Sequence, residues 1–125
     1  MKTMAQQYTP IETAKELLKD IDFFVDDNTL EPCRGGGAFY DNIHKGTKDW
    51  CEIDHQRDFF EAHYDFKFTK VITMPPYWDS TNKKNIFYKF INKCFDVCSD
   101  EVWLLISLTG LNSLTPTRLK KSISF

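Results

Sequence analysis

Residues 29–37, Thr29-Leu30-Glu31-Pro32-Cys33-Arg34-Gly35-Gly36-Gly37, place a short strand candidate directly before a glycine loop. The segment that follows, Gly37 to Ile43, has the pattern expected where a helix begins. In a βα unit the turn after the strand brings backbone N–H groups close to a polar ligand, and glycine makes that approach sterically possible. The order strand, loop, helix therefore predicts the first unit of an α/β sheet.

Further strands and helices alternate along the rest of the chain. Apolar runs predict strands at Trp50–Ile53, Lys70–Thr73 and Val102–Ile106, and the last is apolar throughout, as in parallel sheets. Apolar residues at three- and four-residue steps predict helices from Pro10, with Thr9 as its cap, to near Asp22, and over Ile86–Val97. This alternation predicts one α/β domain over residues 1–125, with a mostly parallel sheet.

Composition limits the classes of function. The chain has 125 residues, 42% of them hydrophobic and 15% aromatic, which predicts a single globular core. A net charge of −2 argues against wholesale electrostatic capture of nucleic acid, so any such binding should depend on a local patch. The basic clusters available for phosphate contacts are Lys83, Lys84, Lys89 and Lys93, and Arg118, Lys120 and Lys121, although such runs are usually a solvated face.

The cysteines and histidines do not predict a metal site. Cys33, Cys51, Cys94 and Cys98 lack the paired short spacings of zinc ligands, and His44, His55 and His63 add no ligand motif. The chain shows neither an apolar signal core at its start nor a run of about 18 apolar residues. We therefore expect free thiols, a cytoplasmic location and no membrane partner.

The segment Thr73-Met74-Pro75-Pro76-Tyr77-Trp78 follows a predicted strand downstream of the glycine loop. Together these motifs resemble the S-adenosylmethionine-dependent adenine-specific DNA methyltransferases, whose active-site loop is Asn/Asp/Ser-Pro-Pro-Tyr/Phe/Trp. The resemblance runs from about Gln7 to about Lys120 and implies a Rossmann-like class I methyltransferase fold. Family members continue through two further strands, so we expect a C-terminally truncated form. The last strand would then lie at a sheet edge, open to a partner or a second copy.

The resemblance implies a cofactor site for S-adenosylmethionine. Glu31, Gly35 and Gly37 would surround its methionine part, with Tyr8 and Thr9 closing over that end. Glu52 would hold the ribose diol, because one carboxylate can accept two hydrogen bonds. Asp58 would accept from the adenine amino group, with Phe59 against the ring. The alternatives are a flexible turn or an RNA-binding Arg-Gly-Gly element for the loop, a solvated strand end for Glu52 and an ordinary helix cap for Thr9.

The resemblance also implies catalytic roles for Met74, Pro75, Pro76 and Tyr77. The Pro75 carbonyl would accept one hydrogen of the target amine, and Tyr77 would stack on a base flipped out of its helix. Trp78 would extend this stacking wall. Met74 departs from the family, because a thioether is a weak acceptor where an amide or carboxylate is expected. A Pro-Pro-Tyr recognition motif for a partner's aromatic groove is the alternative.

The function implied is methyl transfer to the exocyclic amino group of adenine in DNA, weakened by Met74. A second hypothesis is a degenerate, non-catalytic domain that binds adenosylmethionine, nucleic acid or a partner. A third is methyl transfer to RNA or to a protein glutamine, because the same loop serves those substrates in related enzymes. Of DNA and RNA, we expect DNA as the nucleic-acid partner.

Overall fold

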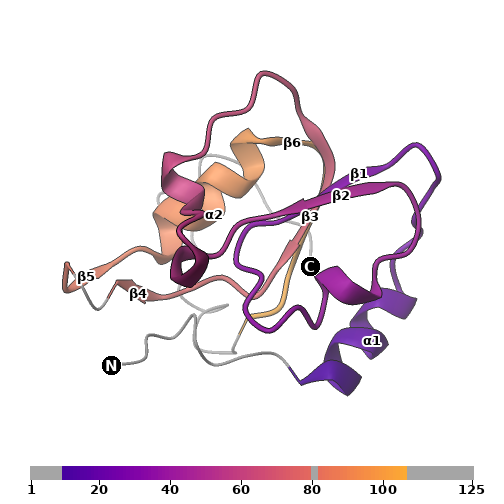
Figure 1. Ribbon diagram of the computed structural model, residues 1–125, viewed down its shortest axis with the longest axis horizontal. Coiled ribbons are helices and arrows are strands. Elements are labelled where there is room, and N and C mark those ends of the chain that lie inside the picture. The colour runs from indigo at the N-terminus through magenta and orange to yellow at the C-terminus, as the bar shows by residue number, and fades with distance from the viewer. Residues whose placement is uncertain (1–9, 80–81, 107–125) are drawn as a thin grey trace.

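The computed structural model describes residues 10–79 and 82–106 (Figure 1). Its two α-helices are α1 (Ile11–Lys19) and α2 (Phe87–Asp96). The main strands are β1 (Asn28–Glu31), β2 (Thr47–Trp50), β3 (Phe68–Thr73) and β6 (Cys98–Leu104), and a hairpin pairs β4 (Trp78–Asp79) with β5 (Lys84–Asn85). Short 3₁₀ turns cover η2 (Tyr40–Asn42), η3 (Ile53–His55) and η4 (Phe59–Glu61).

The main sheet has four strands in the order β2-β1-β3-β6, and every neighbouring pair is parallel. The chain leaves β1 toward β2 on one side and later returns to β3 on the other side. The expectation of an α/β domain with a parallel sheet is therefore confirmed, and the strand order is compatible with a Rossmann-like fold. In such sheets the crevice for a ligand opens at the carboxyl ends of the two strands where the order reverses, here β1 and β3.

Helices cover both faces of this sheet, because successive side chains of a strand point to opposite faces. Val71 packs in the cluster that includes Phe90 and Cys94 of α2. Its neighbour Ile72 packs in the cluster that includes Ala14 of α1. Figure 1 shows α1 and α2 on opposite sides of the strands, which gives three layers.

Two expectations around the second strand are wrong. The strand is Thr47–Trp50 rather than Trp50–Ile53, because Thr47 to Trp50 pair with Asn28 to Glu31 in parallel register. The helix expected from Gly37 to Ile43 is only the 3₁₀ turn η2, after which Ile43 is already extended. The earlier start of β2 leaves room for one turn only. Glu52 consequently lies two residues beyond the end of β2.

The first helix is shorter than its apolar pattern predicted. It begins at Ile11, because the Pro10 carbonyl accepts the first helical bond from the Ala14 N–H at 3.0 Å. It ends at Lys19, where Asp20 adopts the cap position, rather than near Asp22. Thr9, expected as its cap, lies outside the described residues. The predicted second helix is present as α2, one residue shorter at each end, and the predicted last strand is present as β6, which begins four residues earlier and ends two residues earlier.

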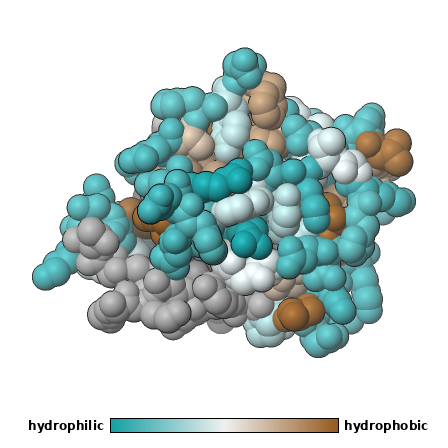
Figure 2. Space-filling model, in the orientation of Figure 1, coloured by the Kyte–Doolittle hydropathy of each residue, from teal (hydrophilic) through white to brown (hydrophobic). Residues whose placement is uncertain are grey.

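Strand β6 has a neighbour on one side only among residues 10–79 and 82–106, namely β3. Its carboxyl half, Val102 to Leu104, is partly buried. The face in Figure 2 is mostly hydrophilic, with isolated hydrophobic residues rather than one large apolar patch. Within the same residues, neither helix is long and apolar enough to cross a membrane.

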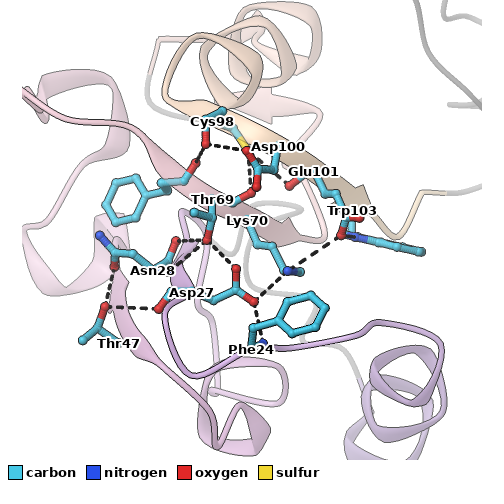
Figure 3. Close-up of polar contacts among 12 residues, drawn as sticks. Phe24, Asp27, Asn28, Thr47, Thr69, Lys70, Cys98, Asp100, Glu101 and Trp103 are labelled. Carbon is cyan, nitrogen blue, oxygen red and sulfur yellow. Dashed lines mark hydrogen bonds and ion pairs between the residues drawn. The ribbon is translucent and has the colours of Figure 1, made fainter.

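An ion pair joins the start of β1 to β3 inside the domain (Figure 3). The Lys70 ammonium lies 2.7 Å from the Asp27 carboxylate, and both side chains are almost fully buried. Asp27 also accepts hydrogen bonds from the Thr69 hydroxyl at 2.7 Å and the Phe24 N–H at 2.8 Å. This cluster lies toward the amino ends of the strands, away from the crevice described above.

Candidate functional site

The candidate site lies at the carboxyl edge of the sheet, where the segments after β1, β2 and β3 meet. Glu31 ends β1, Glu52 follows β2, and Thr73 ends β3. All three side chains are buried: their exposed fractions are 2%, 3% and 0%. Parallel strands bring their carboxyl ends to one edge, so residues distant in sequence form one polar cluster.

The glycine loop is fixed to the segment after β2. The Gly35 N–H donates to Glu52 Oε1 at 2.8 Å, and the Arg34 N–H donates to the Cys51 carbonyl at 2.9 Å. Gly35 and Gly37 have φ angles of 57° and 91°, the left-handed region that glycine adopts without steric cost. The loop is therefore a preformed structure, which argues against a flexible surface turn.

Glu52 holds two backbone donors at once. Besides Gly35 it accepts the Asp54 N–H at 3.2 Å and so caps the turn η3. A carboxylate offers about four acceptor positions, so capacity remains for a ligand. The solvated strand end considered as its alternative does not fit a side chain that is 3% exposed.

Glu31 is a buried carboxyl group with little compensation. Within the described part of the chain it accepts one hydrogen bond of good geometry, from the Cys33 N–H at 3.0 Å. Burial raises its pKa to about 8; the Cys33 amide, the Thr73 hydroxyl and Arg34 oppose this rise, and the charge of Glu52 adds to it. The Thr73 oxygen lies beside this carboxyl yet makes no hydrogen bond of good geometry. Carboxyl groups perturbed in this way are concentrated at functional sites.

Arg34, expected only as part of the alternative Arg-Gly-Gly element, projects from the glycine loop over the ring of Trp50, 4.5 Å from its centroid. Arg57 lies 4.0 Å from the same centroid and pairs with Asp49 at 2.7 Å. The buried Nε of Arg34 has no hydrogen-bond partner in the described part of the chain. Arginine within the glycine loop was the only sequence signal for this contact.

The Pro-Pro-Tyr segment leaves the sheet directly after β3, as predicted, and runs into the β4–β5 hairpin. Met74 packs against the apolar cluster that includes Ile72 and Phe39. Pro75 and Pro76 are buried. Tyr77 stacks on Phe87 of α2, with ring centroids 4.3 Å apart and planes 5° from parallel. Trp78 is 44% exposed at the start of the hairpin.

Asp58 and Phe59 make their contacts with η4 and α2 rather than with the glycine loop or Glu52. Asp58 caps η4 by accepting the Phe60 N–H at 2.9 Å. Phe59 is 2% exposed and packs on Phe90 of α2, with centroids 5.0 Å apart. Lys93 donates to the carbonyls of Phe59 and Ala62, so this basic residue of α2 holds the turn. In this conformation Phe59 offers almost no surface to a ligand ring.

The structure thus brings together Glu31, Gly35, Gly37 and Glu52, and the segment from Met74 to Tyr77 leaves the sheet at the same edge, after β3. Tyr8 and Thr9 lie outside the described residues. His44, His55 and His63 are exposed, and the described residues contain no cluster of three potential metal ligands. Sequence reasoning missed Arg34, Trp50 and Thr73. The position of Thr73 before Met74 could have suggested it, because the last residue of a parallel strand faces the ligand edge.

No protein-family model matches this sequence, and comparisons with curated proteins and with solved structures give no match either.

Proposed function

We propose that this domain binds S-adenosylmethionine at the carboxyl edge of its sheet and transfers the methyl group to the exocyclic amino group of adenine in DNA. The observation that carries the proposal is the hydrogen bond between Glu52 and the Gly35 N–H. It joins the acid after β2 to the glycine loop after β1. Acid, glycine loop and switch point are the three elements that nucleoside-containing cofactors require of such sheets.

The residues fit the cofactor in charge and shape. Glu52 is held by two backbone donors, and its remaining lone pairs would accept hydrogen bonds from a ribose diol. Glu31 and Thr73 offer buried polar atoms that lack full compensation, which suits an ammonium group. The bound cofactor would supply an activated methyl group; these side chains bind and orient it.

The Pro-Pro-Tyr segment would hold the acceptor base. Its place after β3 puts it on the same edge as Glu31, across the switch point. The parallel stack of Tyr77 on Phe87 fixes the plane of the tyrosine ring. A fixed aromatic plane favours base stacking, which is worth about 1–3 kcal/mol per base. The carbonyl of Pro75 would accept one of the amine hydrogens.

A second candidate is a domain that binds the cofactor, nucleic acid or a partner without catalysis. Met74 favours it, because the side chain at this position packs against the apolar cluster of Ile72 and Phe39. Loss of one acceptor to the reacting group costs about 2.7–4 kcal/mol, or a hundred- to a thousandfold in rate. A slow methyltransferase and a non-catalytic domain can therefore be distinguished by measuring methyl transfer.

The test is incorporation of label from methyl-tritiated adenosylmethionine into DNA, into RNA and into protein, with the wild-type chain, Met74→Asn and Met74→Leu. Leucine keeps the apolar packing and adds no acceptor, so it is the matched control. Asparagine should raise transfer to adenine about a hundred- to a thousandfold over both others. It should also lower the free energy of unfolding by about 1–3 kcal/mol, because an amide enters an apolar contact.

Transfer of label to RNA or to protein, and not to DNA, would show that the domain is a methyltransferase with a different substrate. Cofactor binding with no transfer by any of the three chains would establish the non-catalytic candidate. Brisk wild-type transfer that Met74→Asn leaves unchanged would refute the acceptor role of residue 74.

A further inference from the structure

The carboxyl edge buries two acidic side chains without a paired cation. Glu31 and Glu52 are 2% and 3% exposed, and neither forms an ion pair within the part of the chain that the structure describes. The lysine and arginine pairs of the domain involve other acids. A buried charge is costly unless it is paired and hydrogen-bonded. Two such groups near each other indicate either a bound proton or a missing cationic partner.

A second observation points to a ligand. Thr73 is fully buried at the end of β3, and its hydroxyl lies beside the Glu31 carboxyl with no hydrogen-bond partner of good geometry among residues 10–79 and 82–106. Unpaired buried hydroxyl groups are rare in folded proteins, since each costs free energy. A donor-rich group placed between Thr73 and Glu31 would satisfy both.

The other groups around Glu31 cannot take that place. Besides Glu52, the charged or titratable groups whose fields act on it are Arg34, the Cys33 thiol and the Cys94 thiol of α2. Burial raises the pKa of both thiols well above its usual range, so they remain neutral. Arg34 stacks on Trp50 and makes no salt bridge with Glu31. Glu31 accepts one backbone N–H, whereas Glu52 accepts two.

We propose that Glu31 is protonated in the ligand-free domain and releases this proton when an ammonium group binds beside it and Thr73, so that ligand affinity depends on pH. The inference rests on the proposed function, because the amino-acid part of the adenosyl cofactor supplies that ammonium group. On binding, the O–H bond of the Glu31 carboxyl breaks and its proton goes to solvent. The ligand keeps its own protons, and a carboxylate–ammonium pair replaces a neutral buried acid.

The direction of the pH dependence of ligand affinity follows from the linkage between binding and protonation. Binding selects the ionised form of Glu31, whose pKa in the ligand-free state is about 8, so affinity rises with pH below that value. Between pH 6 and 7.5 the association constant should increase about 25-fold. At pH 7 about 0.9 proton should be released per ligand bound.

The test is calorimetric titration of the full chain with S-adenosylhomocysteine at pH 7, in buffers of different ionisation enthalpy, and then from pH 6 to 7.5. The control ligand is 5′-methylthioadenosine, which has the nucleoside and sulfur but no ammonium group. It should bind without proton release. Glu31→Gln keeps the side-chain shape and has no proton to release, so its affinity for S-adenosylhomocysteine should be independent of pH. Glu52→Gln should retain part of the proton release, because burial remains while the charge that adds to the raised pKa of Glu31 is removed.

Binding with no proton release and with constant affinity over this range would refute the coupling and leave the proposed function standing. No binding of either ligand at millimolar concentration would refute both. A direct measurement on the ligand-free chain adds an independent check: the ¹³C resonance of the Glu31 carboxyl should titrate near pH 8. A midpoint near the ordinary value of 4.5 would overturn the inference whatever the ligand does.

Discussion

Asp27→Asn should strongly destabilise the domain, because it breaks the buried ion pair that joins the start of β1 to β3. The Asp27 and Lys70 side chains are only 6% and 4% exposed. Asparagine keeps the shape of aspartate and removes its charge. The ammonium of Lys70 would then be left with half-exposed Glu101 at 4.0 Å and with the rings of Phe23 and Phe24.

The expected size of the effect follows from this burial. Removing one partner of a buried pair costs about 3–5 kcal/mol, because the other charge stays desolvated without compensation. A domain of this size has a free energy of unfolding of about 5–15 kcal/mol, so the variant should be near the limit of stability. Adding Lys70→Met removes the orphaned charge, and the double variant should recover most of the loss.

Urea unfolding followed by circular dichroism measures these changes, provided that the denaturant slope stays constant between variants. The pH dependence gives a second readout. Burial would raise the pKa of Asp27, but its bonds to Lys70, the Phe24 N–H and Thr69 outweigh this and lower it below the ordinary 3.8. The stabilisation is therefore present above about pH 4 and is lost as pH falls through the lowered value. A cost below about 1 kcal/mol for Asp27→Asn, or no recovery in the double variant, would refute this reasoning.

Two further predictions concern local supports of the fold, one at Gly46 and one at Lys93. Gly46→Ala should lower the free energy of unfolding by more than about 2 kcal/mol, because φ is +79° and an added Cβ would lie 2.3 Å from the Asp27 carbonyl oxygen. Gly36 is exposed, so the control variant Gly36→Ala should change the free energy of unfolding by no more than about 0.5 kcal/mol in the same urea assay. Lys93→Met should leave the carbonyls of Phe59 and Ala62 without their donor and speed hydrogen exchange in η4 selectively. Equal stability of the two glycine variants, or unchanged exchange in η4, would contradict these assignments.

The sequence predicted the elements whose apolar pattern is strong. Strand β3 and helix α2 were found because each contains a buried apolar run, and β6 because its carboxyl half is apolar. Strand β1 was found because it directly precedes the glycine loop. Strand β2 was misplaced because Thr47 to Asp49 are polar, and only pairing with β1 makes them a strand. The hydrophobic pattern of the sequence carries little information about an edge strand such as β2, because its position is set by pairing with the neighbouring strand.

The candidate site was predictable in its order along the chain and less so in its contacts. The acids at Glu31 and Glu52 were expected at strand ends, yet the bond from Gly35 to Glu52 depends on the βα geometry between them. Phe59 was expected against a ligand ring, whereas it packs on Phe90, a residue 31 positions later in the chain. The ion pair of Asp27 with Lys70, 43 positions apart, had no sequence signal because tertiary structure alone creates it.

Binding of an adenosyl ligand at the carboxyl edge of the sheet can be followed by the amide chemical shifts of the ¹⁵N-labelled chain during titration with S-adenosylhomocysteine. We expect saturable shifts for Gly35, Gly37 and Asp54, whose N–H groups lie in or beside the glycine loop and Glu52. Amides at the opposite edge, such as those of Asp27 and Thr47, should not move. Shifts confined to that opposite edge, or no shifts at millimolar ligand, would contradict the account.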